Sequence, residues 1–199
     1  MQAAFFREPG QFELLATTVL PELGRRRGRR IRLWSAGCGS GEDAWSIAMV
    51  AAEARLPPGR EVEIIATDGD PAALARAAEA VYSDPEMRRV DAKRRQRHFV
   101  RGVGPRQGLW RVIAPLRDRV ELYELDLAGP WPAGAPFDAV FCAAPIARLD
   151  PPGAYRLARR FGEVLAPGGA LFLGQAPTSP GDLPDLAPWR PGVFRKRAG

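Results

Sequence analysis

The stretch that decides the fold reads Arg32-Leu-Trp-Ser-Ala-Gly-Cys-Gly-Ser-Gly-Glu-Asp43, and Ile64-Ile-Ala-Thr-Asp68 follows it along the chain. An apolar run ends in closely spaced glycines and then meets an amphipathic segment, which predicts a strand, a tight turn and a helix. Such a turn lets the backbone approach a ligand, and the helix offers that ligand its free N–H groups. Asp68, at the end of the next strand, is placed to accept hydrogen bonds from both hydroxyls of a ribose. The sequence therefore predicts a nucleotide site.

The glycines Gly37, Gly39 and Gly41 follow the spacing G-x-G-x-G, whereas dinucleotide enzymes more often show G-x-G-x-x-G. Glu42 and Asp43 come directly after them, where they would repel a pyrophosphate but suit a cationic ammonium. This pattern resembles the first motif of S-adenosylmethionine (SAM) methyltransferases, whose cofactor has no phosphate and a cationic methionine end. The glycines alone are also compatible with a turn that only allows close packing of helix on strand.

Length and composition place the chain among ordinary globular proteins. Its 199 residues suit one α/β domain, residues 1–199, and 46% of them are apolar and 26% charged. We find no apolar run long enough for a membrane helix and no signal peptide, so we expect a cytoplasmic protein. Cys38 and Cys142 lack the spacing of metal ligands. We expect both to be buried thiols and expect no metal site.

The net charge of +6 raises the question of a nucleic-acid partner. The basic residues gather at 25–30, 88–89, 93–95 and 195–197. A solvated basic face explains these clusters equally simply, and attraction to an acidic protein surface is a further alternative. We favour the solvated face and do not expect the chain to bind nucleic acid.

Strand and helix patterns alternate along most of the chain. The expected elements are a helix at 10–23, strand 31–36, helix 42–55, strand 62–67, helix 71–80, strands 119–124 and 137–142, helix 151–165, strand 170–174 and an edge strand at 189–196. This alternation predicts an α/β fold with a parallel sheet and helices on both faces. We expect Pro167-Gly168-Gly169 to separate the last helix from its strand, and 176–188 to be a loop.

The segment at about 82–118 interrupts this alternation and is too long for a simple connection. Its glycine-rich centre, flanked by alternating apolar residues, predicts a β-hairpin at 99–113. We expect a small inserted antiparallel β-subdomain whose exposed edge could bind a partner peptide as an extra strand. The alternative is that the insert only covers the cofactor. His98, within it, is expected to be structural.

Several segments, in order along the chain, together carry a family resemblance. They are Phe5-Phe-Arg-Glu8, Trp34-Ser-Ala-Gly-Cys-Gly-Ser-Gly-Glu-Asp43, Ser46-Ile-Ala-Met49, Ala66-Thr-Asp-Gly-Asp70, Arg97-His-Phe-Val-Arg-Gly-Val-Gly-Pro105, Phe137-Asp-Ala-Val-Phe-Cys142 and Leu165-Ala-Pro-Gly-Gly169. The chain resembles the catalytic domain of the chemotaxis-receptor methyltransferases, the CheR family. The resemblance implies a Rossmann-like fold and SAM as cofactor. It also implies methyl transfer to glutamate carboxylates of chemoreceptors or a related acidic protein, and a β-subdomain that in some members docks a receptor tail.

The resemblance also implies roles for individual residues. Arg7 would lie near the SAM carboxylate and the reacting groups, and Asp43 would face the methionine end. Asp68 would hold the ribose, while Asp126 and Leu127 stand where the family has Asn-Leu near the adenine.

The chain departs from the family pattern on the acceptor side. After the fourth strand the family reads approximately Cys-Arg-Asn-Val-x-Ile-Tyr-Phe, and this chain reads Cys142-Ala-Ala-Pro-Ile-Ala-Arg-Leu149. Arg148 therefore stands in place of a tyrosine and is our candidate for an acceptor clamp. Gly174-Gln-Ala-Pro177 replaces Gly-His-Ser-Glu, and Met1 and Ala3 replace two polar residues. The family's N-terminal helical domain has no counterpart in this sequence.

Methyl transfer to an ionised carboxylate needs no general base, so a missing catalytic triad does not count against an enzyme. We prefer an active SAM-dependent protein carboxyl methyltransferase, because the cofactor half of the motif set is kept. The first alternative is a catalytically impaired protein that binds SAM, or nothing, and serves as a partner-binding module through residues 99–113. The second is an RNA or small-molecule methyltransferase, which only the charge suggests. The chain lacks the Asn/Asp-Pro-Pro-Tyr type of motif that base-methylating enzymes often carry after the fourth strand.

Overall fold

The computed structural model describes residues 4–26, 30–174 and 183–198. Met1, Ala3 and Gln175-Ala-Pro177, which we compared with polar positions of the family, lie outside these residues. The same holds for residues 27–29 of the first arginine cluster and for most of the expected loop at 176–188.

The larger of two sheets has seven strands among the described residues, in the order β6-β2-β1-β7-β8-β10-β9. These strands are β1 Ile31–Ala36, β2 Val62–Asp68, β6 Val120–Glu124, β7 Phe137–Phe141, β8 Leu165–Phe172, β9 Leu186–Arg190 and β10 Val193–Lys196. The first five are parallel, and β10 runs antiparallel to both β8 and β9. The order reverses between β1 and β7, and ligands of such α/β sheets bind beyond the carboxyl ends of the strands at this point. The predicted α/β, Rossmann-like fold is confirmed.

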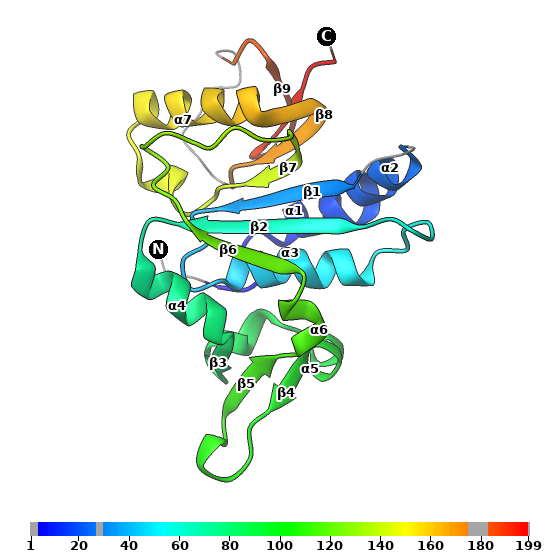
Figure 1. Cartoon of the computed structure of the whole chain (residues 1–199), viewed down its shortest axis with the longest axis vertical. Helices are drawn as coiled ribbons and strands as arrows, with labels where there is room; N and C mark the ends of the chain where they lie inside the picture. The colour runs from blue at the N-terminus through cyan, green and yellow to red at the C-terminus, as the bar shows by residue number, and fades with distance from the viewer. Residues whose placement is uncertain (1–3, 27–29, 175–182, 199) are drawn as a thin grey trace.

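Helices cover both faces of this sheet (Figure 1). The helical segments are α1 Pro9–Leu14, the π-helical η1 Leu15–Val19, α2 Leu20–Arg25, α3 Glu42–Glu53, α4 Pro71–Glu79, the short η4 Ile146–Arg148 and α7 Pro151–Val164. The N-terminal helices and α3 contribute to one hydrophobic core, and α7 contributes to the other. The helix expected at 10–23 is therefore present, with a π-helical turn in its middle.

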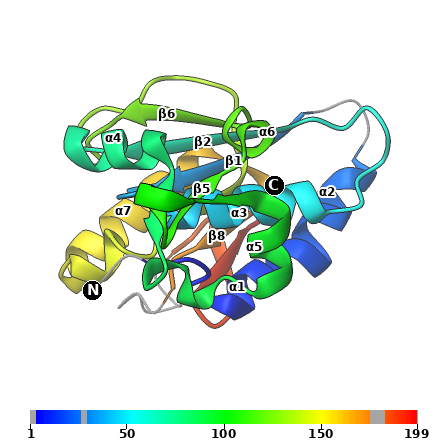
Figure 2. The same ribbon diagram turned by 90° about the horizontal axis from the view of Figure 1, so that it is seen from below.

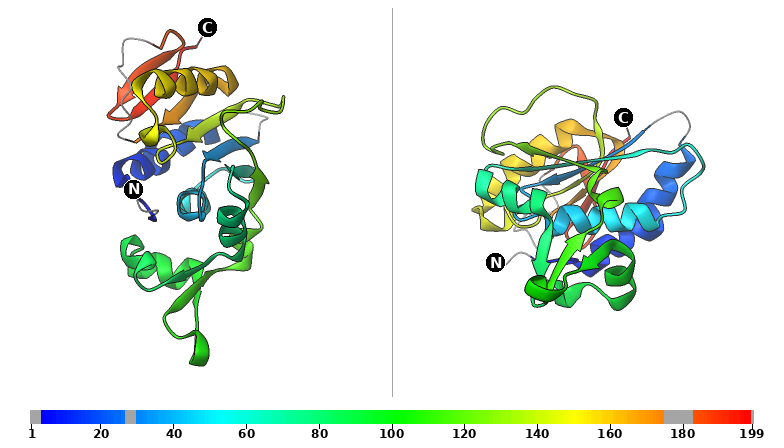
Figure 3. Two further views of the ribbon diagram at one scale, coloured as in Figure 1. Left: turned by 90° about the vertical axis from the view of Figure 1, so that its left-hand side faces the viewer. Right: turned by 60° about the horizontal axis from the view of Figure 1, so that its bottom comes forward.

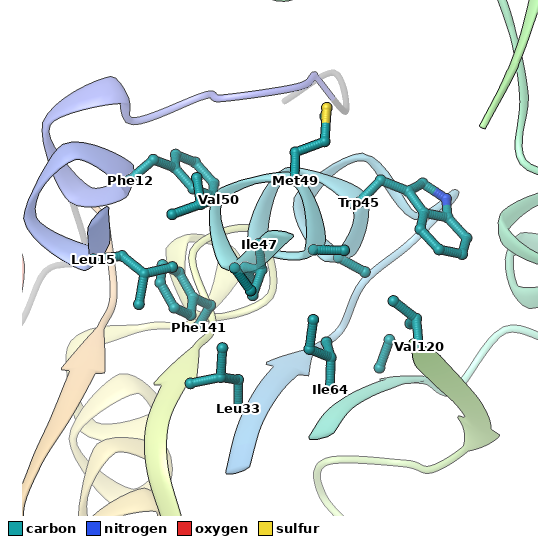
Figure 4. Close-up of a cluster of buried hydrophobic side chains, with 14 of the residues drawn as sticks. Phe12, Leu15, Leu33, Trp45, Ile47, Met49, Val50, Ile64, Val120 and Phe141 are labelled. Carbon is teal, nitrogen blue, oxygen red and sulfur yellow. The ribbon is translucent and has the colours of Figure 1, made fainter. Parts of the chain in front are cut away.

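Large side chains fill the space between α3 and the sheet (Figure 4). Ile47 of α3 points toward Leu33 and Ile64 of the strands, while Phe12 enters from the N-terminal helix. Each such side chain contributes about 1.5–3 kcal/mol when it leaves water. On the opposite face, the ring of Trp34 lies 5.3 Å from that of Phe161 in α7. These two cores hold the carboxyl ends of β1 and β2 in place.

A second, three-stranded antiparallel sheet has the order β3-β5-β4. Its region contains β3 Val81–Ser83, η2 Glu86–Arg89, α5 Ala92–His98, β4 Phe99–Arg101, η3 Gly104–Arg106, β5 Leu109–Val112 and α6 Ala114–Arg117. We call residues 81–117 the inserted subdomain. It lies against α3 (Figure 2), where Tyr82 and Phe99 join the same core as Trp45. The expected antiparallel insert is thus present.

Two details at the end of the sheet differ from the sequence prediction. β8 begins at Leu165, so Pro167-Gly168-Gly169 lies inside the strand and does not precede it. The pairing with β7 is irregular beside this tripeptide, between Phe137 and Ala139, which accommodates a proline that cannot donate a ladder hydrogen bond. The expected single edge strand is a hairpin of β9 and β10, which turns at Gly192 with φ +66°. The expected loop therefore ends where β9 begins.

Within residues 4–26, 30–174 and 183–198, no helix combines the length and apolarity needed to cross a bilayer. The same residues hold no group of three or more side chains that would bind a metal ion. Cys38 and Cys142 are buried free thiols, as predicted.

Candidate active site

The turn after β1 is built on left-handed backbone conformations. Gly37, Gly39 and Gly41 have φ values of +69°, +55° and +97°, which residues with a β-carbon rarely adopt. The N–H of Cys38, between the first two, donates to the carbonyl of Thr67 at 2.8 Å. This hydrogen bond ties the turn to the end of β2.

The three glycines differ in how much free space surrounds their α-carbons. A β-carbon on Gly37 would lie 2.0 Å from Cγ of Pro145, and one on Gly41 would lie 2.7 Å from Nε1 of Trp45. A β-carbon on Gly39 would meet no atom within 4 Å. Close packing therefore explains two of the glycines, while the third faces open space.

Asp68 ends β2 and points toward this turn. Its Oδ2 accepts the N–H of Gly39 at 2.7 Å, and its Oδ1 accepts the N–H of Asp70 at 3.0 Å. Each carboxylate oxygen has two lone pairs, so both can accept a further hydrogen bond. The carboxylate is thereby held in an orientation that suits a vicinal diol.

A cavity of about 290 Å³ opens at the carboxyl ends of β1 and β2. It is lined by Arg7, Gly37, Cys38, Gly39, Asp68, Gly69, Leu125, Asp126, Leu127, Ala144, Pro145 and Arg148. Seven of the nine residues selected from the sequence are among these. This volume is at the lower end of the range of small-molecule sites, which begins at about 300 Å³.

The two selected residues that do not line the cavity, Gly41 and Asp43, lie beside it. Oδ2 of Asp43 is 3.6 Å from Nη2 of Arg7, which does line the cavity. Burial raises the pKa of Asp43 to about 6, against the opposing effect of Arg7, and Glu42 and Glu8 raise it further. Asp43 therefore acts on the cavity through Arg7.

Glu42, which the sequence pattern placed beside a cationic ligand end, has a different position. Its side chain is buried, and its carboxylate accepts a hydrogen bond from Oγ of Ser40 at 2.8 Å. It stabilises the turn internally and does not line the cavity.

The segment after β7, where the resemblance implies the acceptor side, forms another part of the cavity lining. Ala144, Pro145 and Arg148 line the cavity, and Arg148 comes from η4. Together with Arg7, this places two guanidinium groups around one hollow. Guanidinium groups bind carboxylates through paired, charge-assisted hydrogen bonds.

Three further side chains with reactive groups, Cys38, Cys142 and His98, are buried. Burial raises the pKa of Cys38 to about 12, with a smaller contribution from Asp68, and burial also raises the pKa of Cys142. Both thiols stay protonated at neutral pH and are poor nucleophiles. His98 is buried, with Nε2 2.9 Å from Oε1 of Glu53, away from the cavity.

Sequence reasoning missed one contact of the turn. The hydroxyl of Tyr82, in β3 of the inserted subdomain, donates to the carbonyl of Ser40 at 2.6 Å. No local pattern links these residues, since the chain between them forms α3, β2 and α4.

The lining residues fit SAM. Asp68 can accept hydrogen bonds from a ribose, and Leu125 and Leu127 offer apolar surface to a base. Arg7, paired with Asp43 beside the cavity, offers a guanidinium to a carboxylate. The fold and cavity thus define a class, an α/β domain of the SAM-dependent methyltransferase type. The chain belongs to the CheR family: its residues 2–186 match the family model described as CheR methyltransferase, SAM binding domain.

Curated relatives agree with this family. The chain is 37% identical over 174 residues to the chemotaxis protein methyltransferase of Klebsiella aerogenes, and 37% identical over 175 residues to that of Escherichia coli. These matches cover 87% of this chain and 58% and 59% of the two relatives. The chain thus spans a little more than half the length of these proteins.

Solved structures support the fold. DszA carbon methyltransferase superposes with a TM-score of 0.51 and 19% identity, covering 83% of this chain and 35% of that one. PKMT2 from Rickettsia typhi superposes with a TM-score of 0.51 and 14% identity, covering 86% of this chain and 26% of that one.

Proposed function

We propose that this protein binds SAM in the cavity beneath the glycine turn and transfers its methyl group to a carboxylate of an acidic protein. The observation that carries the proposal is the meeting of Gly39, Asp68, Arg7 and Arg148 around one hollow. The first three residues would hold the nucleoside and the methionine end, and Arg148 would clamp the anionic acceptor.

The chemistry asks for alignment more than for acid or base catalysis. SAM supplies an electrophilic methyl group on a sulfonium, and the acceptor carboxylate is ionised at neutral pH. Asp68 and Leu127 would fix the nucleoside, while Arg7 would orient the carboxylate of the methionine end. Holding the reacting groups in line contributes roughly 7–11 kcal/mol in well-aligned systems. Excluding water helps further, because opposite charges are neutralised during transfer.

We propose the cytoplasmic region of a chemoreceptor as the acceptor, which would require the protein to work in the cytoplasm. The names of the relatives, chemotaxis protein methyltransferases, support this choice. The hairpin at 99–113 is our candidate for docking a receptor segment. Its strand β4 is at an edge of the small sheet, and Val100 and Val103 are 61% and 81% exposed.

Two measurements test this proposal in sequence. Calorimetric titration with S-adenosylhomocysteine should show saturable binding to one site. Incubation with methyl-labelled SAM and receptor-bearing membranes should then give label that alkali releases as methanol. Absence of binding would rule out the cofactor site. Binding without alkali-labile label from several acceptors would rule out the transfer.

A second candidate function follows from the acceptor side. Ala144 lines the cavity, and Ala143 precedes it where the family carries polar residues, which favours a protein that binds SAM but transfers poorly. Such a protein would act as a partner-binding module. A double variant Ala143→Arg/Ala144→Asn, which restores the family residues, should raise methyl transfer if lost polar contacts limit it.

A further inference from the structure

The inserted subdomain contacts the segment that carries Arg7. Nη1 of Arg89 donates to the carbonyl of Arg7 at 3.0 Å. The neighbouring ring of Phe5 packs edge-on against Tyr82 and Phe99, with centroid distances of 4.8 and 5.8 Å. Figure 3 shows the N-terminal segment lying between α3 and the inserted subdomain. The backbone of Arg7 is thus held from the side of the insert.

Phe6, which lies between Phe5 and Arg7 in the chain, has a strained backbone. Its φ of +47° is in the left-handed region, which costs a residue with a β-carbon about 1–2 kcal/mol. Two contacts hold it there. Its N–H donates to Oγ of Ser46 in α3 at 3.1 Å, and the guanidinium of Arg94 from α5 lies 4.5 Å from its ring centroid. Such strain persists only when the surroundings over-determine it.

The same subdomain also contacts the glycine turn. The buried hydroxyl of Tyr82 donates to the carbonyl of Ser40, between Gly39 and Gly41. A β-carbon on Gly41 would lie 3.0 Å from that hydroxyl, so the turn is closely packed on the tyrosine.

We propose that the inserted subdomain positions the cofactor cavity, with Arg89 setting the place of Arg7 and Tyr82 setting the place of the glycine turn. Both are positioning residues, since neither lines the cavity. This inference rests on the proposed function and adds a second role to the insert, beyond docking a partner. Partner docking and cofactor binding would then be coupled, because a partner that shifts the insert would also shift Arg7 and the glycine turn.

Arg89 offers a clean test because it is exposed, so its replacement leaves the core intact. The probes are S-adenosylhomocysteine, which carries the methionine carboxylate, and 5′-methylthioadenosine, which lacks it. Arg89→Ala should weaken binding of the first by roughly tenfold, which corresponds to about one hydrogen bond, and leave binding of the second unchanged. Arg89→Lys should recover part of the loss, because a lysine can also donate to the carbonyl of Arg7.

Arg88→Ala is the matched control. Arg88 is the exposed neighbour of Arg89, and its Nε donates to the carbonyl of Pro85 within the insert. This variant should bind both probes like the wild type. Equal weakening of both probes by Arg89→Ala would indicate a general structural effect and overturn the inference, as would unchanged binding of both.

Tyr82→Phe tests the second contact by removing only the hydroxyl. It should weaken both probes by a similar factor, because the glycine turn borders the shared nucleoside part. Unchanged affinity for both, at an unchanged melting temperature, would contradict the role of Tyr82. Failure of the wild type to bind S-adenosylhomocysteine would defeat the proposed function itself. A wild type that binds, with variants that bind equally well, would defeat only this inference.

Discussion

At the scale of single residues, Asp68 is the best defined group of the cavity. The N–H groups of Gly39 and Asp70 each donate to one of its oxygens, and these hydrogen bonds fix the rotamer of the side chain in the cavity lining. Asp68 could be selected from the sequence because it is an acidic residue at the end of the strand that follows the glycine turn and its helix. That type of argument works because the carboxyl ends of neighbouring parallel strands meet at one edge.

We predict that Asp68→Ala weakens binding of S-adenosylhomocysteine at least about tenfold, since hydrogen bonds to a charged group contribute about 1.5–3 kcal/mol each. Isothermal calorimetry measures this directly. Glu124→Ala is the control, because Glu124 pairs with Asp68 in the register of β2 and β6 but is exposed and does not line the cavity. Equal affinity of the Asp68 variant and the wild type would remove Asp68 from the site.

The raised pKa of Asp43 gives a pH-dependence. Burial raises this pKa to about 6, with Arg7 opposing the shift and Glu42 and Glu8 adding to it. Below pH 6 the protonated carboxyl no longer forms an ion pair with Arg7, so the guanidinium that lines the cavity loses the partner that holds it in place. Binding of S-adenosylhomocysteine should therefore strengthen by a few-fold, up to about tenfold, as the pH rises through 6.

The check is calorimetry between pH 5 and pH 8. Asp43→Asn should bind weakly at every pH in this range and show no step near 6. Glu13→Gln, an exposed carboxylate of α1, should keep the step of the wild type. A step that survives in the Asp43 variant would assign the titration to another group.

At the scale of elements, two glycines of the same turn have different roles: we expect Gly37 to affect stability and Gly39 to affect ligand binding. Gly37→Ala would force a methyl group to 2.0 Å from Pro145 at a φ of +69°, and should cost roughly 2–4 kcal/mol of the free energy of unfolding. Gly39→Ala meets no atom within 4 Å and should cost only about 1 kcal/mol, from its φ of +55°. The methyl group of Gly39→Ala would instead occupy part of the cavity that we assign to the ligand.

Thermal unfolding and calorimetry together check this pair. For a chain of this size, 1 kcal/mol corresponds to about 2–4 °C in melting temperature. Gly39→Ala should keep most of its melting temperature and lose ligand affinity, whereas Gly37→Ala should lose far more of its melting temperature. The reverse order would contradict the assignment of the open side of the turn.

The elements that the sequence predicted well have strong local patterns. Ile31–Ala36 is an apolar run that ends in glycine, and Glu42–Glu53 is a helix that starts directly after the turn. The elements that differ depend on distant partners. Leu165–Phe172 continues through Pro167-Gly168-Gly169 because Leu165 and Ala170, on either side of this tripeptide, both pair with β7 across an irregular register. No residue within the segment indicates this pairing.

At the scale of the whole molecule, a charged cluster joins the inserted subdomain to α3. Glu53, near the end of α3, accepts hydrogen bonds from Arg94 and lies 2.9 Å from Nε2 of His98. Burial raises the pKa of Glu53, but the hydrogen bonds of Arg94 and His98 together lower it. A lowered pKa means that the cluster stabilises the fold fully above about pH 4.5 and that this stability is lost as the pH falls through the lower, folded value.

We predict that Glu53→Gln lowers the free energy of unfolding at pH 7 and reduces its decline below pH 4.5. Urea unfolding at pH 7 and pH 4 measures both effects. Glu61→Gln is the control, because Glu61 is 68% exposed in its ion pair with Arg30 and such surface pairs contribute little. A Glu53 variant that declines in acid as steeply as the wild type would show that other groups govern acid unfolding.

Much of the candidate cavity could be predicted from sequence, because its residues follow strand ends or family motifs. The rest required the three-dimensional arrangement. The pairing of Asp43 with Arg7 has no signal in the sequence, and the contacts of Tyr82 and Arg89 join segments with no shared pattern. Side chains that position other side chains have no sequence periodicity of their own.

The cavity draws its walls from Arg7, Gly39, Asp68, Asp126 and Arg148, which are scattered over most of the chain. An unfolded chain presents no such arrangement, so a nucleoside ligand would bind the native state alone. By mass action, a ligand at a hundred times its dissociation constant should add about 2.7 kcal/mol to the free energy of unfolding. A melting temperature that climbs with the logarithm of S-adenosylhomocysteine concentration would therefore report occupancy without any knowledge of the methyl acceptor.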